Sequence, residues 1–184
     1  MKRFLFFLLF LNLFFISDAQ KYMTKNGYIG FFSHTPIEDI KADNNQVASV
    51  LDVSTGEIVF QVLIKSFHFE KALMEQHFNE SFLESDKFPR STFKGRIVNL
   101  SMVDFNKNGE YEATVRGDLN IHDVTKNISV TGTVEVVPGG INANAKFNIA
   151  PEDYNIKIPS VVRENIAKII EVTIAIKYTA LEKK

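Results

Sequence analysis

The four histidines are the side chains of this sequence best suited to acid–base or metal chemistry. His68 and His77 lie nine positions apart, with Glu70 and Glu75 between them. A zinc hydrolase helix uses His-Glu-x-x-His, which places two imidazoles on one helix face, and the sequence does not contain this spacing. No pair of carboxylates has a spacing typical of general acid–base catalysis. The sequence therefore predicts no metal site and no catalytic residue.

Three serines near His77 suggest a second interpretation, a secreted hydrolase. Ser81, Ser85 and Ser91 lie close in sequence to His77 and Asp86, which are the residue types of a Ser-His-Asp triad. The nucleophilic serine of an α/β-hydrolase occupies a Gly-x-Ser-x-Gly turn, and none of the three is framed in this way. Ser81 and Ser85 fit better as turn or helix-cap residues. The hydrolase remains the weaker alternative.

Composition excludes several classes of function. The chain has no cysteine, which rules out thiol catalysis, thiolate metal sites and haem attached through cysteine. The formal net charge is −1, and Lys and Glu are scattered along the chain. A nearly neutral chain of this kind has no electrostatic attraction for nucleic acid or for an anionic membrane. We expect neither nucleic acid nor a cofactor as a partner.

The N-terminus has the pattern of a secretory signal peptide. Lys2 and Arg3 precede an apolar run from residue 4 to residue 16, and small residues follow at Ser17 and Ala19. This run of thirteen residues, interrupted only by Asn12, is too short for a membrane-spanning helix, which needs about 20. We therefore predict cleavage of residues 1–19, a periplasmic or secreted protein, and no stable membrane anchor. Residues 20–184 are predicted to form one domain.

Apolar and polar residues alternate with a period of two in the segments that position the histidines and serines. From Glu110 to His122, apolar or small residues alternate with polar ones over thirteen positions, which is typical of a half-buried antiparallel strand. Glycine-containing turns separate such runs. Eight strands are predicted, at residues 28–34, 46–53, 57–68, 91–103, 110–121, 127–137, 141–150 and 168–180. Eight antiparallel strands can close into an all-β barrel around side chains or one elongated ligand.

Two segments interrupt the strands. Residues 70–85 place Leu73, His77 and Phe78 at helical spacing, so we predict a short helix across one mouth of the barrel. Residues 151–166 are expected to be irregular, with a helical turn at residues 162–166.

The interior of the predicted barrel has two interpretations. Its inward positions are almost all apolar, as in a packed core. Several of them are small, which leaves room for a ligand tunnel. These small residues are Gly95, Ala113, Gly117, Gly132, Ala143 and Ala145. The alternation alone does not decide between a filled barrel and a tunnel.

Two motifs resemble the signature of the YceI-like family. They are His77-Phe78 … Phe82-Leu83-Glu84-Ser85-Asp86-Lys87-Phe88-Pro89 … Thr92-Phe93 and Gly117-Asp118-Leu119 … Ile121-His122 … Val124-Thr125-Lys126. The resemblance implies an eight-stranded antiparallel, lipocalin-like barrel with a short helical insert after the third strand. It also implies that a long isoprenoid or another fatty molecule binds inside the barrel. The chain departs from the family pattern at residues 33–42, near one mouth, and at residues 150–155.

With the resemblance, the sequence predicts an exported carrier or sequestering protein that binds an elongated apolar lipid and is not an enzyme. The predicted tunnel residues are Phe60, Val62, Ile64, Phe93, Ile97, Val115, Leu119, Val130, Val134, Phe147, Ile149 and Ile174. The predicted helical cap consists of Met74, His77, Phe78 and Phe82. The first alternative is a non-catalytic stress or interaction protein with a filled barrel, and a homodimer is compatible with either interpretation.

Overall fold

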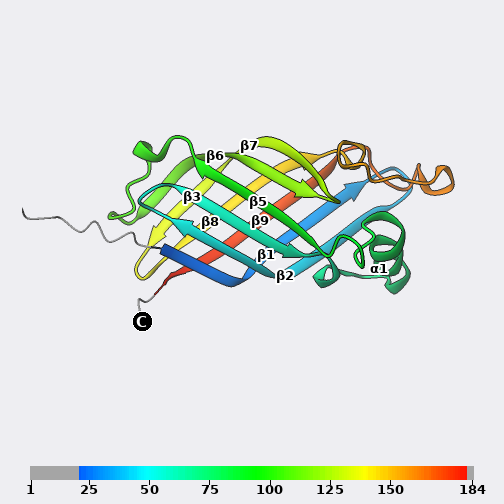
Figure 1. Ribbon diagram of the computed structural model, residues 1–184, viewed down its shortest axis with the longest axis horizontal. Helices are drawn as coiled ribbons and strands as arrows, with labels where there is room; N and C mark the ends of the chain where they lie inside the picture. Colours follow the sequence, from blue (N-terminus) through cyan, green and yellow to red (C-terminus); the bar gives the residue numbers. More distant parts are fainter. Residues whose placement is uncertain (1–20, 182–184) are drawn as a thin grey trace, which may run out of the picture.

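The computed structural model describes residues 21–181, which form a closed antiparallel β-barrel (Figure 1). The predicted signal peptide, residues 1–19, lies outside the described residues. The strands are β1 (Lys21–His34), β2 (Asp39–Asp52), β3 (Glu57–Leu63), β4 (His68–Phe69), β5 (Arg90–Ile97), β6 (Gly109–Ile121), β7 (Val124–Val137), β8 (Gly140–Ile149) and β9 (Ile170–Ala180). Within the described part of the chain, no helix is long and apolar enough to cross a bilayer.

The barrel closes because β1 pairs with both β2 and β9. Every other long strand pairs with its neighbours in chain order, except that β5 follows β3 in the sheet. The short β4 pairs with β2 through Ala42 and Phe69 and is not one of the eight strands that close the barrel. The predicted eight-stranded antiparallel barrel is therefore confirmed.

Helical segments cover one end of the barrel. Helix α1 (Ala72–His77) continues into the single wide turn η2 (Phe78–Phe82), so the predicted helix at residues 70–85 is shorter than expected. The 3₁₀ turns η4 (Pro151–Tyr154) and η5 (Ser160–Val162) lie between β8 and β9. Figure 1 shows α1 and this connection at the same end of the barrel, which we call the mouth. Shorter 3₁₀ turns follow β3 (η1, Ile64–Ser66) and β5 (η3, Leu100–Met102).

The first two strands start earlier than the sequence predicted. β1 begins at Lys21 and β2 at Asp39, although polar residues interrupt the alternation in both. The pairing register shifts between Thr24 and Gly27, which is a bulge in β1. Strand pairing around the closed barrel extends these strands where the hydrophobic pattern ends, because backbone groups gain partners on both sides.

The end of the barrel opposite the mouth is filled with side chains. Leu51, Ile141, Ile176 and Tyr178 are almost completely buried there. The Tyr178 hydroxyl lies 2.7 Å from Ser49 Oγ, which donates its own hydrogen to the Val59 carbonyl, so Tyr178 is the donor to Ser49. Burial raises the pKa of the Tyr178 phenol, which keeps it neutral and bonded in the core.

The small inward residues do not create the open space that the sequence suggested. At Gly95, a Cβ atom would lie 2.6 Å from the ring of Phe93, so this ring occupies the space above the glycine. Gly117 pairs directly with Gly95 on the adjacent strand, and a side chain there would collide with the backbone of β5. These glycines permit close packing rather than a tunnel.

A candidate ligand-binding cavity at the mouth

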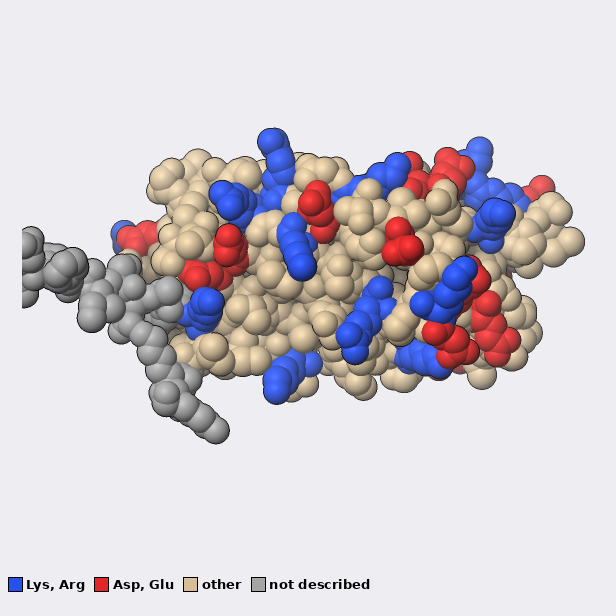
Figure 2. All heavy atoms as spheres, viewed as in Figure 1, with Lys and Arg blue, Asp and Glu red and all other residues tan. Residues whose placement is uncertain are grey.

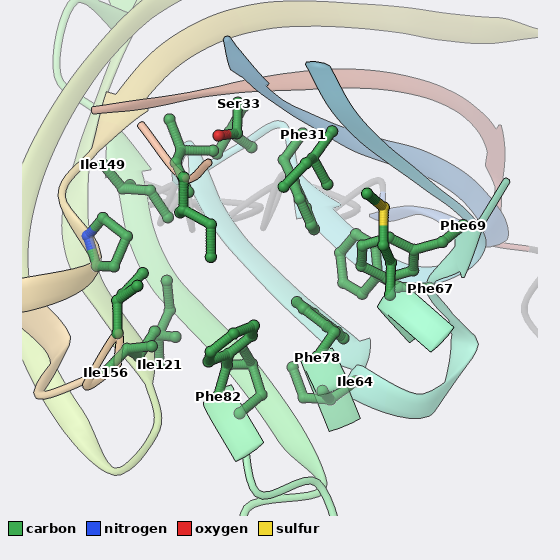
Figure 3. A pocket seen from close by; sticks show the side chains of 18 of the residues that line it. Phe31, Ser33, Ile64, Phe67, Phe69, Phe78, Phe82, Ile121, Ile149 and Ile156 are labelled. Atoms are coloured by element: carbon green, nitrogen blue, oxygen red, sulfur yellow. The ribbon is translucent and has the colours of Figure 1, made fainter. Parts of the chain in front are cut away.

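A cavity of about 260 Å³ occupies the mouth half of the barrel. Its walls come from β1 to β6, β8 and β9, and α1, η2 and the β8–β9 connection cover it. All but five of the lining residues are apolar. In Figure 3, the labelled side chains converge on one hollow, and the single oxygen among the side chains drawn belongs to Ser33. Such a space favours an apolar occupant.

The cavity ends at one level of the barrel. On β3, Val62 lines the cavity but Phe60, the next inward residue, does not. On β5, Ser91 lines the cavity but Phe93 does not. Leu119 of β6, Phe147 of β8 and Val172 of β9 also line the cavity. The next inward residues on these strands, Gly117, Ala145 and Ile174, do not.

Phe60 and Phe93 are the largest side chains at that level, and we call them the floor. The two residues are direct partners across β3 and β5, and their rings meet edge to face with centroids 6.3 Å apart. Phe93 is also paired with Leu119, which lines the cavity. The floor therefore separates the cavity from the filled half of the barrel.

Four phenylalanine rings form one wall under the cap. Phe78 of η2 lies with its ring centroid 5.6 Å from Phe31, 5.5 Å from Phe67 and 5.0 Å from Phe69. Such contacts between rings stabilise a cluster beyond the area that they bury. The cap is thereby packed against β1 and β4, and its apolar face is turned toward the cavity (Figure 3).

A polar clamp joins three segments at the rim. Glu38 of the β1–β2 turn accepts hydrogen bonds from Lys71 Nζ at 2.7 Å and from Asn165 Nδ2 at 3.1 Å. Lys71 precedes α1, and Asn165 belongs to the β8–β9 connection. The hydrogen bond from Lys71, followed by the one from Asn165, lowers the pKa of the Glu38 carboxyl. Glu38 and Asn165 also line the cavity.

Replacing Glu38 with glutamine is expected to lower stability at neutral pH and to have little effect in acid. A carboxyl whose pKa is lowered on folding contributes stability above its unfolded pKa, near 4.5, and the contribution is lost as pH falls through the folded pKa. Urea unfolding of both proteins at neutral pH and at about pH 3 measures this difference. Glu57→Gln is the control, because the Glu57–Arg96 pair is exposed and lies away from the mouth. An equal Glu38→Gln effect at both pH values would contradict the clamp.

Two further side chains hold the mouth together. Ser33 is almost completely buried, and its hydroxyl oxygen accepts the backbone N–H of Ala167 at 2.9 Å. His122 lies between the Tyr154 carbonyl oxygen, at 3.2 Å, and a Glu84 carboxylate oxygen, at 2.9 Å. His122 thus links the β6–β7 hairpin to η4 and to the end of η2.

The structure brings nine of the sixteen predicted ligand residues together around the cavity. These are Val62, Ile64, Met74, His77, Phe78, Phe82, Leu119, Phe147 and Ile149. Four of them, Met74, His77, Phe78 and Phe82, come from the predicted cap. His77 lines the cavity and is exposed, so it marks the rim.

The other seven predicted residues do not line the cavity. Phe60 and Phe93 form the floor, and Ile97, Val115, Val134 and Ile174 lie below it, where side chains from neighbouring strands fill the barrel. Val130 lies on β7 opposite Val115. A ligand confined to the cavity would end at the floor and would not reach the other five residues unless the floor moved.

Several lining residues were not predicted from the sequence. Ile29 and Phe31 of β1 line the cavity, and their alternation with Ser33 is a signal that could have found them. Phe67, Ile156 and Ile166 lie in turns, where no period indicates which side chain points inward. The rim carboxylate Glu38 also had no signal, because its partners are distant in sequence.

The described residues do not assemble the groups that a hydrolase needs. His77 and Ser91 both line the cavity, but no hydrogen bond joins His77 to a serine in the part of the chain that the structure describes. Ser85 is buried, and its backbone N–H bonds the Asn79 carbonyl in a turn. Among residues 21–181, no three His, Asp or Glu side chains lie close enough together to hold a metal ion.

The model of the YceI-like domain matches residues 21–178, which include every strand of the barrel up to Tyr178 of β9. The chain belongs to the YceI-like family. The two motifs of this YceI-like protein contribute the cap, the floor residue Phe93 and the His122 link at the mouth. Its departure at residues 33–42 supplies Ser33, Glu38 and Ile40 to the cavity.

Solved structures have the same fold. A polyisoprenoid binding domain from Saccharophagus degradans, implicated in plant cell wall breakdown, is similar with a TM-score of 0.76 and 13% identity over 89% of this chain and 99% of that one. BcnA from Burkholderia cenocepacia has a TM-score of 0.68 and 13% identity, covering 83% and 96%. A Campylobacter jejuni YCEI protein has a TM-score of 0.62 and 17% identity, covering 82% and 90%. No curated protein matches the sequence.

Proposed function

We propose that this YceI-like protein binds an elongated apolar molecule, an isoprenoid or a fatty chain, in the mouth cavity. The observation that carries the proposal is the cavity of about 260 Å³ with an almost wholly apolar lining. An engineered apolar cavity of about 150 Å³ holds the six carbons of benzene, so at that ratio this cavity holds about ten carbons. The part of a chain beyond about ten carbons would extend out through the mouth or displace the floor residues Phe60 and Phe93.

The polar lining residues suit one end of such a ligand. Ser33 accepts the Ala167 N–H with its oxygen, and its own hydroxyl hydrogen remains free to reach an oxygen inside the cavity. Glu38 and Asn165 lie at the same rim. An apolar chain with a polar end thus fits the lining better than a plain hydrocarbon.

The proposed mechanism is binding without catalysis. Each methylene that leaves water for an apolar site gains about 0.8 kcal/mol, before the costs of ordering the ligand. The filled-barrel alternative is disfavoured by the cavity, although it describes the lower half of the barrel well. The hydrolase alternative is disfavoured because, among residues 21–181, no hydrogen bond joins His77 to a serine.

Calorimetric titration with straight-chain alcohols of increasing length tests the proposal. We expect Kd to fall by up to about fourfold per added methylene, with a negative heat-capacity change, and to level off at about ten carbons. The plateau reports the volume of the cavity. Affinity that does not depend on chain length would contradict binding in this cavity.

We also propose that the protein acts outside the cytoplasm as a carrier or sequestering protein, because its first nineteen residues have the pattern of a signal peptide. N-terminal sequencing of the protein from its native host is expected to begin at Gln20. A protein recovered with residues 1–19 intact would contradict export by cleavage. Homodimer formation stays a prediction.

A further inference from the structure

The β8–β9 connection has two different faces at the mouth. We call residues 156–169 the mouth segment. Its inner face contributes Ile156, Ile158, Val162 and Ile166 to the cavity lining. The segment projects beyond the strands at the mouth end of Figure 1. A partner that approaches the cavity from the mouth end therefore meets the outer face of the mouth segment first.

Large apolar side chains are exposed around the mouth. Val161, at the tip of the mouth segment, is 88% exposed, and Ile169 at its end is 55% exposed. Leu73 of α1 is 62% exposed and Ile37 of the β1–β2 turn is 59% exposed. They come from three separate segments at the rim of one apolar cavity.

The mouth segment also carries three cations. Lys157, Arg163 and Lys168 line one surface depression, together with a single acidic residue, Glu152. None of the three cations makes an ion pair with another residue in the range 21–181. Glu164 is the other nearby acid on the segment. In Figure 2 the tip of the molecule at this end is uncharged, and both basic and acidic side chains lie beside it.

We propose that the mouth docks reversibly on an anionic lipid bilayer, with Val161 inserted and Lys157, Arg163 and Lys168 on the phosphate headgroups. The inference rests on the proposed function, because it gives the apolar cargo a route between bilayer and cavity that avoids water. Apolar tips combined with nearby cations bind a membrane interface through burial and electrostatic attraction. The nearly neutral net charge of the whole chain does not prevent this, since the local depression is basic.

A bilayer fits this surface better than a protein partner does. The four exposed apolar residues come from three separate segments of the rim. Exposed apolar side chains can insert into a bilayer at any spacing, whereas a protein interface needs a complementary pocket for each anchoring side chain. The cavity between the tips would open directly toward the acyl chains.

Vesicle flotation of the protein tests the proposal. We expect binding to vesicles of phosphatidylcholine with phosphatidylglycerol, weaker binding to phosphatidylcholine alone, and loss of binding at high salt. The triple variant Lys157→Gln, Arg163→Gln, Lys168→Gln is expected to bind anionic vesicles about 100-fold more weakly. Val161→Asp is expected to weaken binding at least about tenfold.

Met102→Asp is the matched control, because Met102 is 67% exposed in η3, which follows the end of β5 that lies away from the cavity. We expect it to bind vesicles like the wild type. Absence of vesicle binding, or equal binding by wild type and Val161→Asp, would overturn the proposal. A concentration-dependent dimer that Val161→Asp abolishes, without vesicle binding, would also overturn it and would identify a second copy of the chain as the occupant.

The proposed function and the docking can fail separately. Calorimetry of the same variants with a soluble short-chain alcohol measures the cavity alone, and both docking variants are expected to match the wild type. Normal alcohol binding without vesicle binding would refute only the docking. Vesicle binding without alcohol binding would refute the proposed cargo.

Discussion

Replacing Val62 and Leu119 together with tryptophan is expected to reduce binding of an apolar chain at least about 100-fold while the barrel stays folded. Both side chains line the cavity, Val62 from β3 and Leu119 from β6, the two strands that flank β5 in the sheet. The two substitutions add about thirteen non-hydrogen atoms to a space that holds about ten carbons. The cavity itself takes up the added volume, which limits the strain on the surrounding core. Calorimetric titration with a ten-carbon alcohol measures the loss.

Val59→Trp is the control for the tryptophan variant. Val59 lies on β3 but points outward and is 42% exposed, so its replacement leaves the cavity unchanged. Circular dichroism and thermal unfolding establish that each variant is folded. A folded double variant that binds the alcohol as tightly as the wild type would place the ligand elsewhere.

Replacing Phe93 with alanine is expected to lengthen the chain that the protein encloses. Phe93 is half of the floor, and its ring fills the space above Gly95. Removing the ring opens room for about six more carbons. We therefore expect the affinity plateau across the alcohol series to move from about ten to about sixteen carbons.

Replacing Phe93 with alanine also lowers the stability of the protein, and this effect has to be separated from the effect on the length of the bound chain. Truncating a core phenylalanine destabilises a protein by about 3–5 kcal/mol. Ile141→Ala is the matched control, because it makes a cavity of similar cost in the filled half, away from the mouth. An unchanged plateau in a folded Phe93→Ala protein would show that Phe93 does not limit the cavity.

The alternation of the sequence was sufficient to predict the barrel. A period of two predicted β6, β7, β8 and β9 closely, because each has one more buried and one more exposed face. The strands predicted at residues 57–68 and 91–103 end earlier, at Leu63 in β3 and at Ile97 in β5, where 3₁₀ turns follow. The period of two missed the first halves of β1 and β2, where polar residues such as Lys25 and Asn26 interrupt the pattern. The first half of β1 pairs with the second half of β2 and with β9, and the first half of β2 pairs with the second half of β1, which holds both in the sheet.

The position of the cavity could not be predicted in the same way. Alternation indicates which side chains point inward but not how far each ring reaches. Gly95 and Gly117 therefore suggested a tunnel at a level where Phe93 fills the space. The cap was found because residues 74–82 have helical spacing and match a family motif. The Glu38 clamp depends on contacts with Lys71 and Asn165 that only the folded chain brings together.

Native mass spectrometry of the protein purified from its own host, followed by organic extraction, tests the central claim most directly. We expect a stoichiometric adduct that dissociates without breaking a covalent bond, extracts into organic solvent and is absent from the Val62→Trp, Leu119→Trp variant. A wild-type protein that carries no adduct and takes up no added fatty or isoprenoid chain would contradict the account.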